Sequence, residues 1–451
     1  MKSSRLFSFS VTLLLAALPS VRSAPTDSSV QLRVELDRGV LPAGSTERTI
    51  VKVALASARP PRPDARPPVN LALVIDRSGS MNSDHRIQNA RAAALEALDR
   101  LAADDLVSVV TFGGDVRTVV PAQRVGDGRE VASAIRGIEA GGGTPLFAGV
   151  SQGASEVRKN LDRPGYVPRL LLVSDGVANA GPSTPDELGR LGAALMKEGI
   201  AVTTVGLGLD YNEDLMTQLA RRSDGNTYFA QTAEELPHLF AAELGDVLSV
   251  VARRVVVAVV FPAGVRPVGF VGREGLINGQ TAEITLNQLY GGQEKFALVE
   301  VEVAPGGAGA GREIARATAT FEDAGTEQAV TLTMGATARF SDDREAVVRS
   351  ANLKVQADYA ANAIAVAKDR AVALADAGRR AEAAAVLRAQ ARALDTMGNT
   401  YHNGVVLTIS GLNGIEADRL GRDGLDNATR KDYRTDGANT ISQQRNGRQG
   451  P

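Results

Sequence analysis

The chain contains no cysteine and no tryptophan among its 451 residues. The lack of cysteine excludes disulfides, a thiolate metal site, a cysteine nucleophile and a lipid anchor on an N-terminal cysteine. Aromatic residues make up only 4% of the chain and the formal net charge is -2, so neither a base-stacking surface nor the basic face of a nucleic-acid-binding protein is expected. No uncharged apolar stretch reaches the roughly 20 residues that span a bilayer, which predicts that the chain has no transmembrane segment.

The first residues have the pattern of an export signal. Lys2 and Arg5 precede the uncharged, mostly apolar stretch Leu6–Leu18, and small residues follow up to Ser23. This order predicts a signal peptide at residues 1–23. An exported chain without cysteine fits a bacterial periplasmic or secreted protein.

Two regions of the sequence have the alternating apolar pattern of half-buried strands. One lies within residues 24–57, and the other fills residues 252–340, where Gly- and Pro-bearing turns separate the strands. The second region predicts a small β-sandwich. The first is too short to be stable alone, so its strands are predicted to join that sandwich. A proline-rich linker is predicted at residues 58–68.

Residues 69–251 have a different texture. Short, nearly continuous apolar runs such as Leu71–Ile75 and Leu170–Val173 alternate with amphipathic helical stretches. This alternation is typical of a mostly parallel sheet that is covered by helices on both faces. We therefore expect a doubly wound, Rossmann-like α/β domain.

The C-terminal part divides into two segments. Residues 341–398 are Ala-rich with two apolar stripes at helical spacing, which predicts a helical hairpin resembling a single tetratricopeptide-like unit. Residues 399–451 are mostly polar and rich in Gly, Asn, Asp, Arg and Gln, a composition that predicts a largely disordered tail.

Oxygen-bearing side chains follow the first strand of the predicted α/β domain. The run Leu71–Ile75 leads into Asp76, Ser78 and Ser80, and ligands of open α/β sheets bind outside the carboxyl ends of the strands. Two more elements complete the pattern: Thr144 ends a Gly-rich loop before a helix, and Asp175 follows the strand Leu170–Val173. Such hard oxygen ligands suit Mg²⁺, Mn²⁺ or Ca²⁺ rather than zinc.

These five positions resemble the metal-ion-dependent adhesion site of the von Willebrand factor A family, whose pattern is Asp-x-Ser-x-Ser, then Thr, then Asp. Asp76, Ser78, Ser80, Thr144 and Asp175 match it over roughly residues 69–250. The resemblance implies a bound Mg²⁺ that captures an acidic side chain of a partner protein. The flanking strands and sandwich look like bacterial secreted proteins of this family and inter-alpha-trypsin inhibitor heavy chains.

Each of these residue types also has an ordinary structural role. Asp76 and the two serines are also common loop and capping residues, and Thr144 is a plausible helix N-cap. Against catalysis, the sequence has no His-Glu-x-x-His, no phosphate-binding loop ending in Gly-Lys-Ser or Gly-Lys-Thr, and no Gly-x-Ser-x-Gly at a strand end. No general base stands near the motif for hydrolysis at the metal.

The sequence thus predicts a non-enzymatic protein-binding module for adhesion or assembly. Its ion, Mg²⁺ or else Mn²⁺ or Ca²⁺, would be held by the five residues and would bind a partner with an exposed Asp or Glu. The alternative is a structural or assembly scaffold in which the helical hairpin is the interface and the metal only stabilises a loop.

Overall fold

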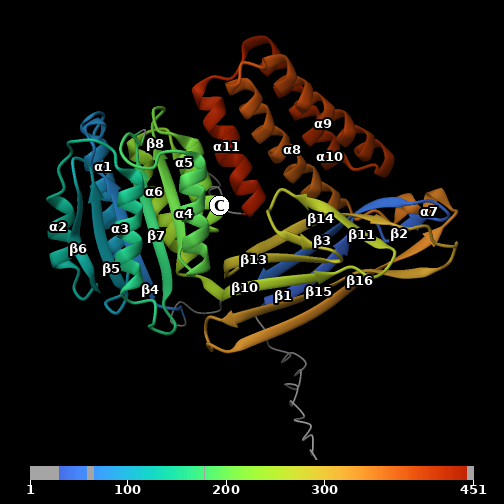
Figure 1. The fold of residues 1–451 in the computed structure, drawn as a ribbon, viewed down its shortest axis with the longest axis horizontal. Coiled ribbons are helices and arrows are strands. Elements are labelled where there is room, and N and C mark those ends of the chain that lie inside the picture. The colour runs from blue at the N-terminus through green and yellow to red at the C-terminus, as the bar shows by residue number, and fades with distance from the viewer. Residues whose placement is uncertain (1–29, 58–65, 177, 444–451) are drawn as a thin grey trace, which may run out of the picture.

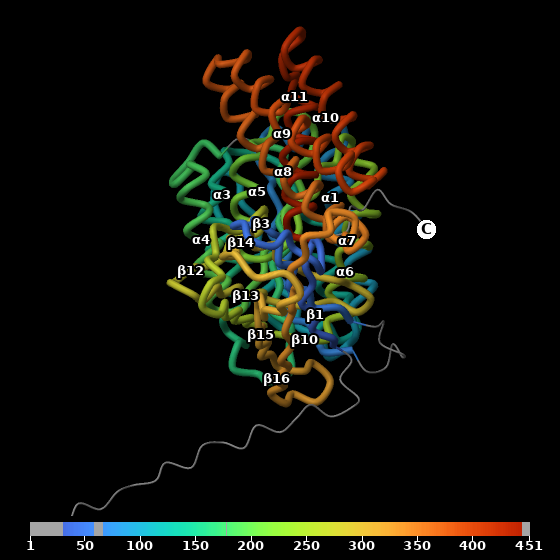
Figure 2. The backbone as a smooth tube through the Cα atoms, turned by 90° about the vertical axis from the view of Figure 1, so that its right-hand side faces the viewer, coloured from blue at the N-terminus to red at the C-terminus, as the bar shows by residue number. Residues whose placement is uncertain are grey.

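The computed structural model describes residues 30–57, 66–176 and 178–443, which form an α/β domain, a β-sandwich and a helical bundle (Figure 1). The predicted signal peptide and most of the predicted linker lie outside the described residues. Figure 2 shows the C-terminal helices at one end of the molecule, with the strands of the sandwich below them.

The α/β domain is built on a six-stranded sheet with the order β6-β5-β4-β7-β8-β9. All neighbouring strands are parallel except β5 and β6. The strands are β4 (Val69–Asp76), β5 (Leu106–Phe112), β6 (Val116–Arg124), β7 (Val167–Ser174), β8 (Ala201–Leu207) and β9 (Thr227–Ala230). Strand order reverses between β4 and β7, which are neighbours although three helices and two strands separate them in sequence.

Helices cover both faces of this sheet. One face packs against α1 (Arg86–Asp99), α2 (Arg129–Arg136) and α6 (Leu236–Val247), and the other against α3 (Leu146–Arg158), α4 (Pro185–Lys197) and α5 (Glu213–Arg222). Every residue of β4, β5 and β8 is buried, as expected for strands sandwiched between helix layers. This confirms the predicted doubly wound α/β fold class.

The sandwich combines strands that precede the α/β domain in sequence with strands that follow it. One sheet has the order β1-β3-β14-β11 and the other β12-β13-β10-β15-β16-β2. In the first, β3 pairs antiparallel with β14, so the N-terminal strands lie beside strands that follow the α/β domain in sequence. The strands are β1 (Val30–Leu36), β2 (Val40–Pro42), β3 (Glu47–Ser57), β10 (Val250–Val260), β11 (Val265–Val271), β12 (Leu276–Asn278), β13 (Thr281–Tyr290), β14 (Glu294–Val303), β15 (Gly311–Asp323) and β16 (Ala329–Ser341).

The helical part is larger than a hairpin. After the short α7 (Arg344–Arg349), it contains α8 (Leu353–Asp376), α9 (Arg380–Tyr401), α10 (Gly404–Asp423) and α11 (Asn427–Ser442). Side chains of α8, α9 and α10 share apolar cores. Ile50, Leu298 and Val355 join α8 to the sandwich, and α11 packs on α8 and α5.

The expectation that residues 399–451 are largely disordered is therefore wrong for the described part of that segment. Polar residues hold these helices through hydrogen bonds that a count of apolar residues does not reveal. Asn403 and Asp426 cap α10 and α11, and Ser410 and Asn413 donate to carbonyls of α9 at 2.7 and 2.8 Å. Among the described residues, no helix is long and apolar enough to cross a membrane.

Candidate functional site

The predicted ligands gather at the carboxyl edge of the sheet, where β4 and β7 meet. Asp76 is the last residue of β4, and Asp175 follows β7 directly. Both carboxylates are fully buried. Because strand order reverses between these two strands, the crevice outside their ends is the expected ligand position of a doubly wound sheet.

The loop after β4 folds back over this crevice. The backbone N–H of Ser78 donates to Asp76 Oδ1 at 2.7 Å, and Ser80 is the second residue of the short 3-10 helix Gly79–Asn82. The hydroxyl oxygens of Ser78 and Ser80 are 3.0 Å apart, and Ser80 donates to Asp175 Oδ1 at 2.7 Å. Four of the five predicted residues thus form one hydrogen-bonded chain.

Thr144 reaches the same place on a glycine loop. Gly142 accepts a hydrogen bond from the N–H of Gly79 at 2.9 Å, which ties this loop to the one that carries the serines. Gly142 has a φ of +94°, and a Cβ there would lie 2.0 Å from the backbone nitrogen of Gly114, so only glycine fits. A Cβ on Gly176 would lie 3.1 Å from Thr144 Oγ1 and 3.5 Å from Asp76 Oδ2, so the hydroxyl and the carboxylate both lie next to Gly176.

The capping alternatives do not account for these side chains. Helix α3 begins at Leu146 after its N-cap Pro145, so Thr144 lies one residue too early to cap it. Ser78 is the N-cap of the 3-10 helix but makes no side-chain capping bond. Asp76 does stabilise its own turn through the N–H of Ser78, a structural role that is compatible with a ligand role.

The oxygen spacing fits a small divalent cation. Mg²⁺ takes six oxygens at about 2.1 Å, which puts adjacent ligand oxygens about 2.9 Å apart. The distances of 3.0 Å from Ser78 Oγ to Ser80 Oγ and 2.7 Å from Ser80 Oγ to Asp175 Oδ1 are close to that edge length. In the described part of the chain, no three His, Cys, Asp or Glu side chains cluster as a metal site, so an ion here depends on the hydroxyls.

Electrostatics also leave this site short of positive charge. Burial raises the pKa of Asp76 to about 6, with a smaller contribution from the charge of Asp175, although hydrogen bonds from Ser174 and Ser78 oppose the shift. Among the described residues, Arg86 pairs with Asp175 at 2.6 Å, and no cation pairs with Asp76. A divalent cation would supply the missing charge.

Three contacts of this site were not predicted from the sequence. Ser174 donates to Asp76 Oδ2, Asn179 accepts from the N–H of Thr144 at 2.8 Å, and Arg86 binds Asp175. Ser174 precedes Asp175 directly, so its place at the strand end was a usable signal. Arg86 is the first residue of α1 and Asn179 lies in the loop after β7, and the sequence pattern does not define how either approaches the strand ends.

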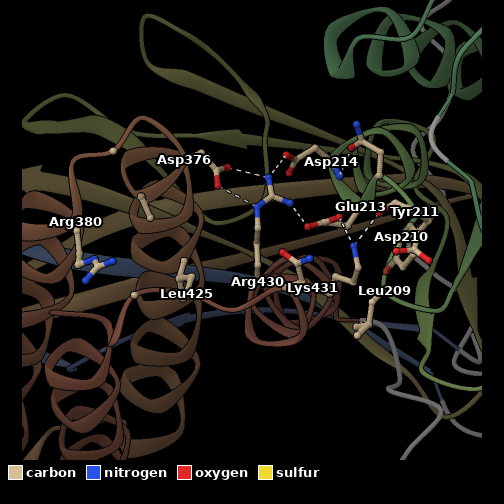
Figure 3. A pocket seen from close by; sticks show the side chains of 15 residues that line it. Leu209, Asp210, Tyr211, Glu213, Asp214, Asp376, Arg380, Leu425, Arg430 and Lys431 are labelled. Atoms are coloured by element: carbon tan, nitrogen blue, oxygen red, sulfur yellow. Dashed lines mark hydrogen bonds and ion pairs between the residues drawn. The ribbon is translucent and has the colours of Figure 1, made fainter. Parts of the chain in front are cut away.

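A second polar site lies where the α/β domain meets the helical bundle. A cavity of about 610 Å³ is lined by residues 209–214, which form the loop after β8 and the start of α5, by residues of α8, α9 and α11, and by the turn before α11. Figure 3 shows Arg430 between Asp376 on one side and Glu213 and Asp214 on the other. Lys431 donates to the carbonyl of Tyr211 at 2.8 Å and to Glu213 at 2.6 Å.

Comparisons with known proteins agree with this geometry. The family model of the von Willebrand factor type A domain matches residues 70–242, which include all five predicted ligands. An uncharacterized protein of Synechocystis sp. is 31% identical over 212 residues, 47% of this chain and 49% of that protein. Mouse inter-alpha-trypsin inhibitor heavy chain H3 is 27% identical over 169 residues, 35% of this chain and 18% of that protein.

The fold similarity extends beyond the matched domain. A solved von Willebrand factor type A protein from Catenulispora acidiphila superposes with a TM-score of 0.66 at 18% identity, covering 86% of this chain and 91% of that chain. At such identity the likeness concerns the fold. This chain spans about half the length of the Synechocystis protein it matches.

Proposed function

Because this chain is a von Willebrand factor type A domain protein, we propose that it is a divalent-cation-dependent protein-binding module for adhesion or assembly. The presence of a domain of this family supports a role in protein interaction, and such domains are generally non-enzymatic. The ligands of the ion are Asp76, Ser78, Ser80, Thr144 and Asp175, and the ion is Mg²⁺, with Mn²⁺ or Ca²⁺ as alternatives. Its role is to capture an exposed Asp or Glu of a partner protein.

The observation that carries the proposal is the meeting of three separate loops at one buried crevice. Five oxygen-bearing side chains lie there, and two of them are fully buried carboxylates of which only one has a cationic partner among the described residues. When bound, the ion supplies the Lewis-acid position that a partner carboxylate completes. The residues of this chain hold the ion and position it at the open end of the sheet.

The export signal read in residues 1–23 supports action outside the cytoplasm, in the periplasm or after secretion. This proposal rests on the sequence pattern alone. Signal cleavage after Ser23, measured by mass spectrometry of the protein recovered from an envelope or culture fraction, tests it. An intact N-terminus in a cytoplasmic fraction contradicts it.

Metal titration tests the site. We expect the full chain to bind about one Mg²⁺ or Mn²⁺ in calorimetry, and Asp76→Asn to abolish binding without unfolding the protein. Asp127→Asn is the matched control, because Asp127 is exposed and pairs only with Arg129 on the surface. Equal binding by wild type and Asp76→Asn would remove the site assignment.

A second test separates ion-mediated capture from the scaffold alternative. Thr144→Ala removes one neutral hydroxyl and no charge, so we expect weak metal binding to persist while most partner affinity is lost; Asp175→Ala loses both. The readout is recovery of partners from the native envelope fraction with Mg²⁺ or with a chelator. Partners that stay bound in the chelator and to Thr144→Ala indicate that the helical bundle is the interface and the metal is structural.

A further inference from the structure

Arg86 is a cation built into the proposed metal site. Its Nη1 donates to Asp175 Oδ2 at 2.6 Å, while Ser80 takes the other oxygen of the same carboxylate. The side chain of Arg86 is only 14% exposed, and Asp175 is fully buried, so water screens this ion pair poorly. Neither oxygen of Asp175 is left without a donor.

The backbone presents Arg86 to this carboxylate at some conformational cost. The two preceding residues, Asp84 and His85, have φ angles of +50° and +55°, in the left-handed region that is unfavourable for residues other than glycine. Across the crevice, Gly208 (φ +73°) lies beside the guanidinium, since a Cβ there would be in ordinary contact with Arg86 Nη2 at 3.4 Å. The strained turn thus lies directly before the arginine that pairs with Asp175.

The charges of the site then favour binding of ion and partner together. Arg86 also pairs with Asp84 at 3.3 Å and Asp210 at 3.9 Å, but those two carboxylates are 78% and 80% exposed, so water screens them. Among the buried groups, Asp76, Asp175 and Arg86 sum to one negative charge, so a bound divalent cation leaves one surplus positive charge there. A carboxylate from a partner cancels that surplus. Without the arginine charge, the two carboxylates and the ion would already be neutral and the partner would add an uncompensated negative charge.

We propose that Arg86 keeps the affinity of the site for a divalent cation low until a carboxylate arrives, so that the ion and an acidic partner bind cooperatively. This inference rests on the proposed function, whose ion site it uses. It adds a residue outside the five-residue motif that determines when the site fills and that favours anionic partners over neutral ones.

Calorimetry with Mn²⁺ alone tests the inference on the full chain. Arg86→Gln keeps a donor for Asp175 but removes the charge, so we expect it to bind Mn²⁺ at least tenfold more tightly than wild type. Arg86→Lys retains the charge and should stay within about threefold of wild type. Arg91→Gln is the matched control, because Arg91 lies on the same helix and donates to the carbonyl of Arg136.

A second titration in excess acetate measures the coupling. Acetate is the carboxylate probe, and it should tighten Mn²⁺ binding by wild type more than by Arg86→Gln. Unchanged or weaker Mn²⁺ binding by a folded Arg86→Gln overturns the inference while leaving the ion site intact. If wild type and Arg86→Gln both fail to bind Mn²⁺, or if Asp76→Asn binds as well as wild type, the proposed function fails instead.

Discussion

Gly176 offers a sharp test of whether Thr144 and Asp76 share one ion. A Cβ at this position would lie 3.1 and 3.2 Å from the Oγ1 and Cγ2 of Thr144 and 3.5 Å from Asp76 Oδ2. Gly176 does not have a positive φ, so alanine introduces no backbone strain there. The added methyl group must displace the Thr144 side chain by a few tenths of an ångström.

The two consequences of that shift differ in size. Modest overpacking costs about 1 kcal/mol of unfolding free energy, whereas Mg²⁺ requires near-ideal octahedral geometry, and displacing groups that orient metal ligands typically costs 10–100-fold in affinity. We expect Gly176→Ala to melt within a few degrees of wild type and to bind Mg²⁺ at least tenfold more weakly in calorimetry. Gly307→Ala is the control, because no atom lies within 4 Å of its Cβ position. Wild-type Mg²⁺ affinity in Gly176→Ala would refute a shared ion.

Three further predictions concern the packing of the three parts. In Gly153→Ala, the new Cβ would meet Val74 Cγ2 at 2.4 Å, so α3 and the sheet must move apart. We expect the free energy of unfolding, measured in urea, to fall by about 2 kcal/mol. An unchanged midpoint of the urea transition would contradict this packing. Arg430→Ala leaves Glu213 and Asp214 without that partner, so amide hydrogen exchange should become faster in α11 but not in β4 or β7. If α11 is protected equally in wild type and variant, the ion pairs of Arg430 do not stabilise that helix. Burial raises the pKa of Glu294, but hydrogen bonds from Lys52 and Lys354 outweigh it and lower that pKa to about 2. A lowered carboxyl pKa stabilises the fold above about pH 4.5, and this contribution is lost as pH falls toward 2. The free energy of unfolding should therefore change less steeply with pH in Glu294→Gln than in wild type, by up to about 1.4 kcal/mol per pH unit. Identical slopes in the two proteins would contradict this prediction.

The α/β fold was predictable because its signals are local and periodic. Strands such as Leu71–Ile75 are continuous apolar runs, and the helices between them are amphipathic, so sequence period alone indicates a covered parallel sheet. The five oxygen-bearing residues were visible for a related reason. They follow strand ends or a glycine loop, and parallel strands bring their carboxyl ends to one edge.

The C-terminal helices were not predictable by the same reasoning. The buried positions of α11 include the polar residues Lys431, Thr435 and Asn439. A segment of such polar composition is predicted to be disordered when only the burial of apolar surface is considered. These side chains bind partners far away in sequence: Lys431 binds Glu213, and Asn439 donates to the carbonyl of Thr227. Such contacts depend on the tertiary fold, so no window of sequence contains both halves of them.

The same tertiary contacts link the two functional hypotheses. Residues 209–214, the loop after β8 and the start of α5, lie at the edge of the sheet that carries the proposed ion site, and Asp210 lies 3.9 Å from Arg86. This segment also anchors the bundle, because Tyr211 and Glu213 bind Lys431 of α11 (Figure 3). Because this one segment contacts both the proposed ion site and α11, chelation and Arg430→Ala must be tested separately before either interface is assigned alone.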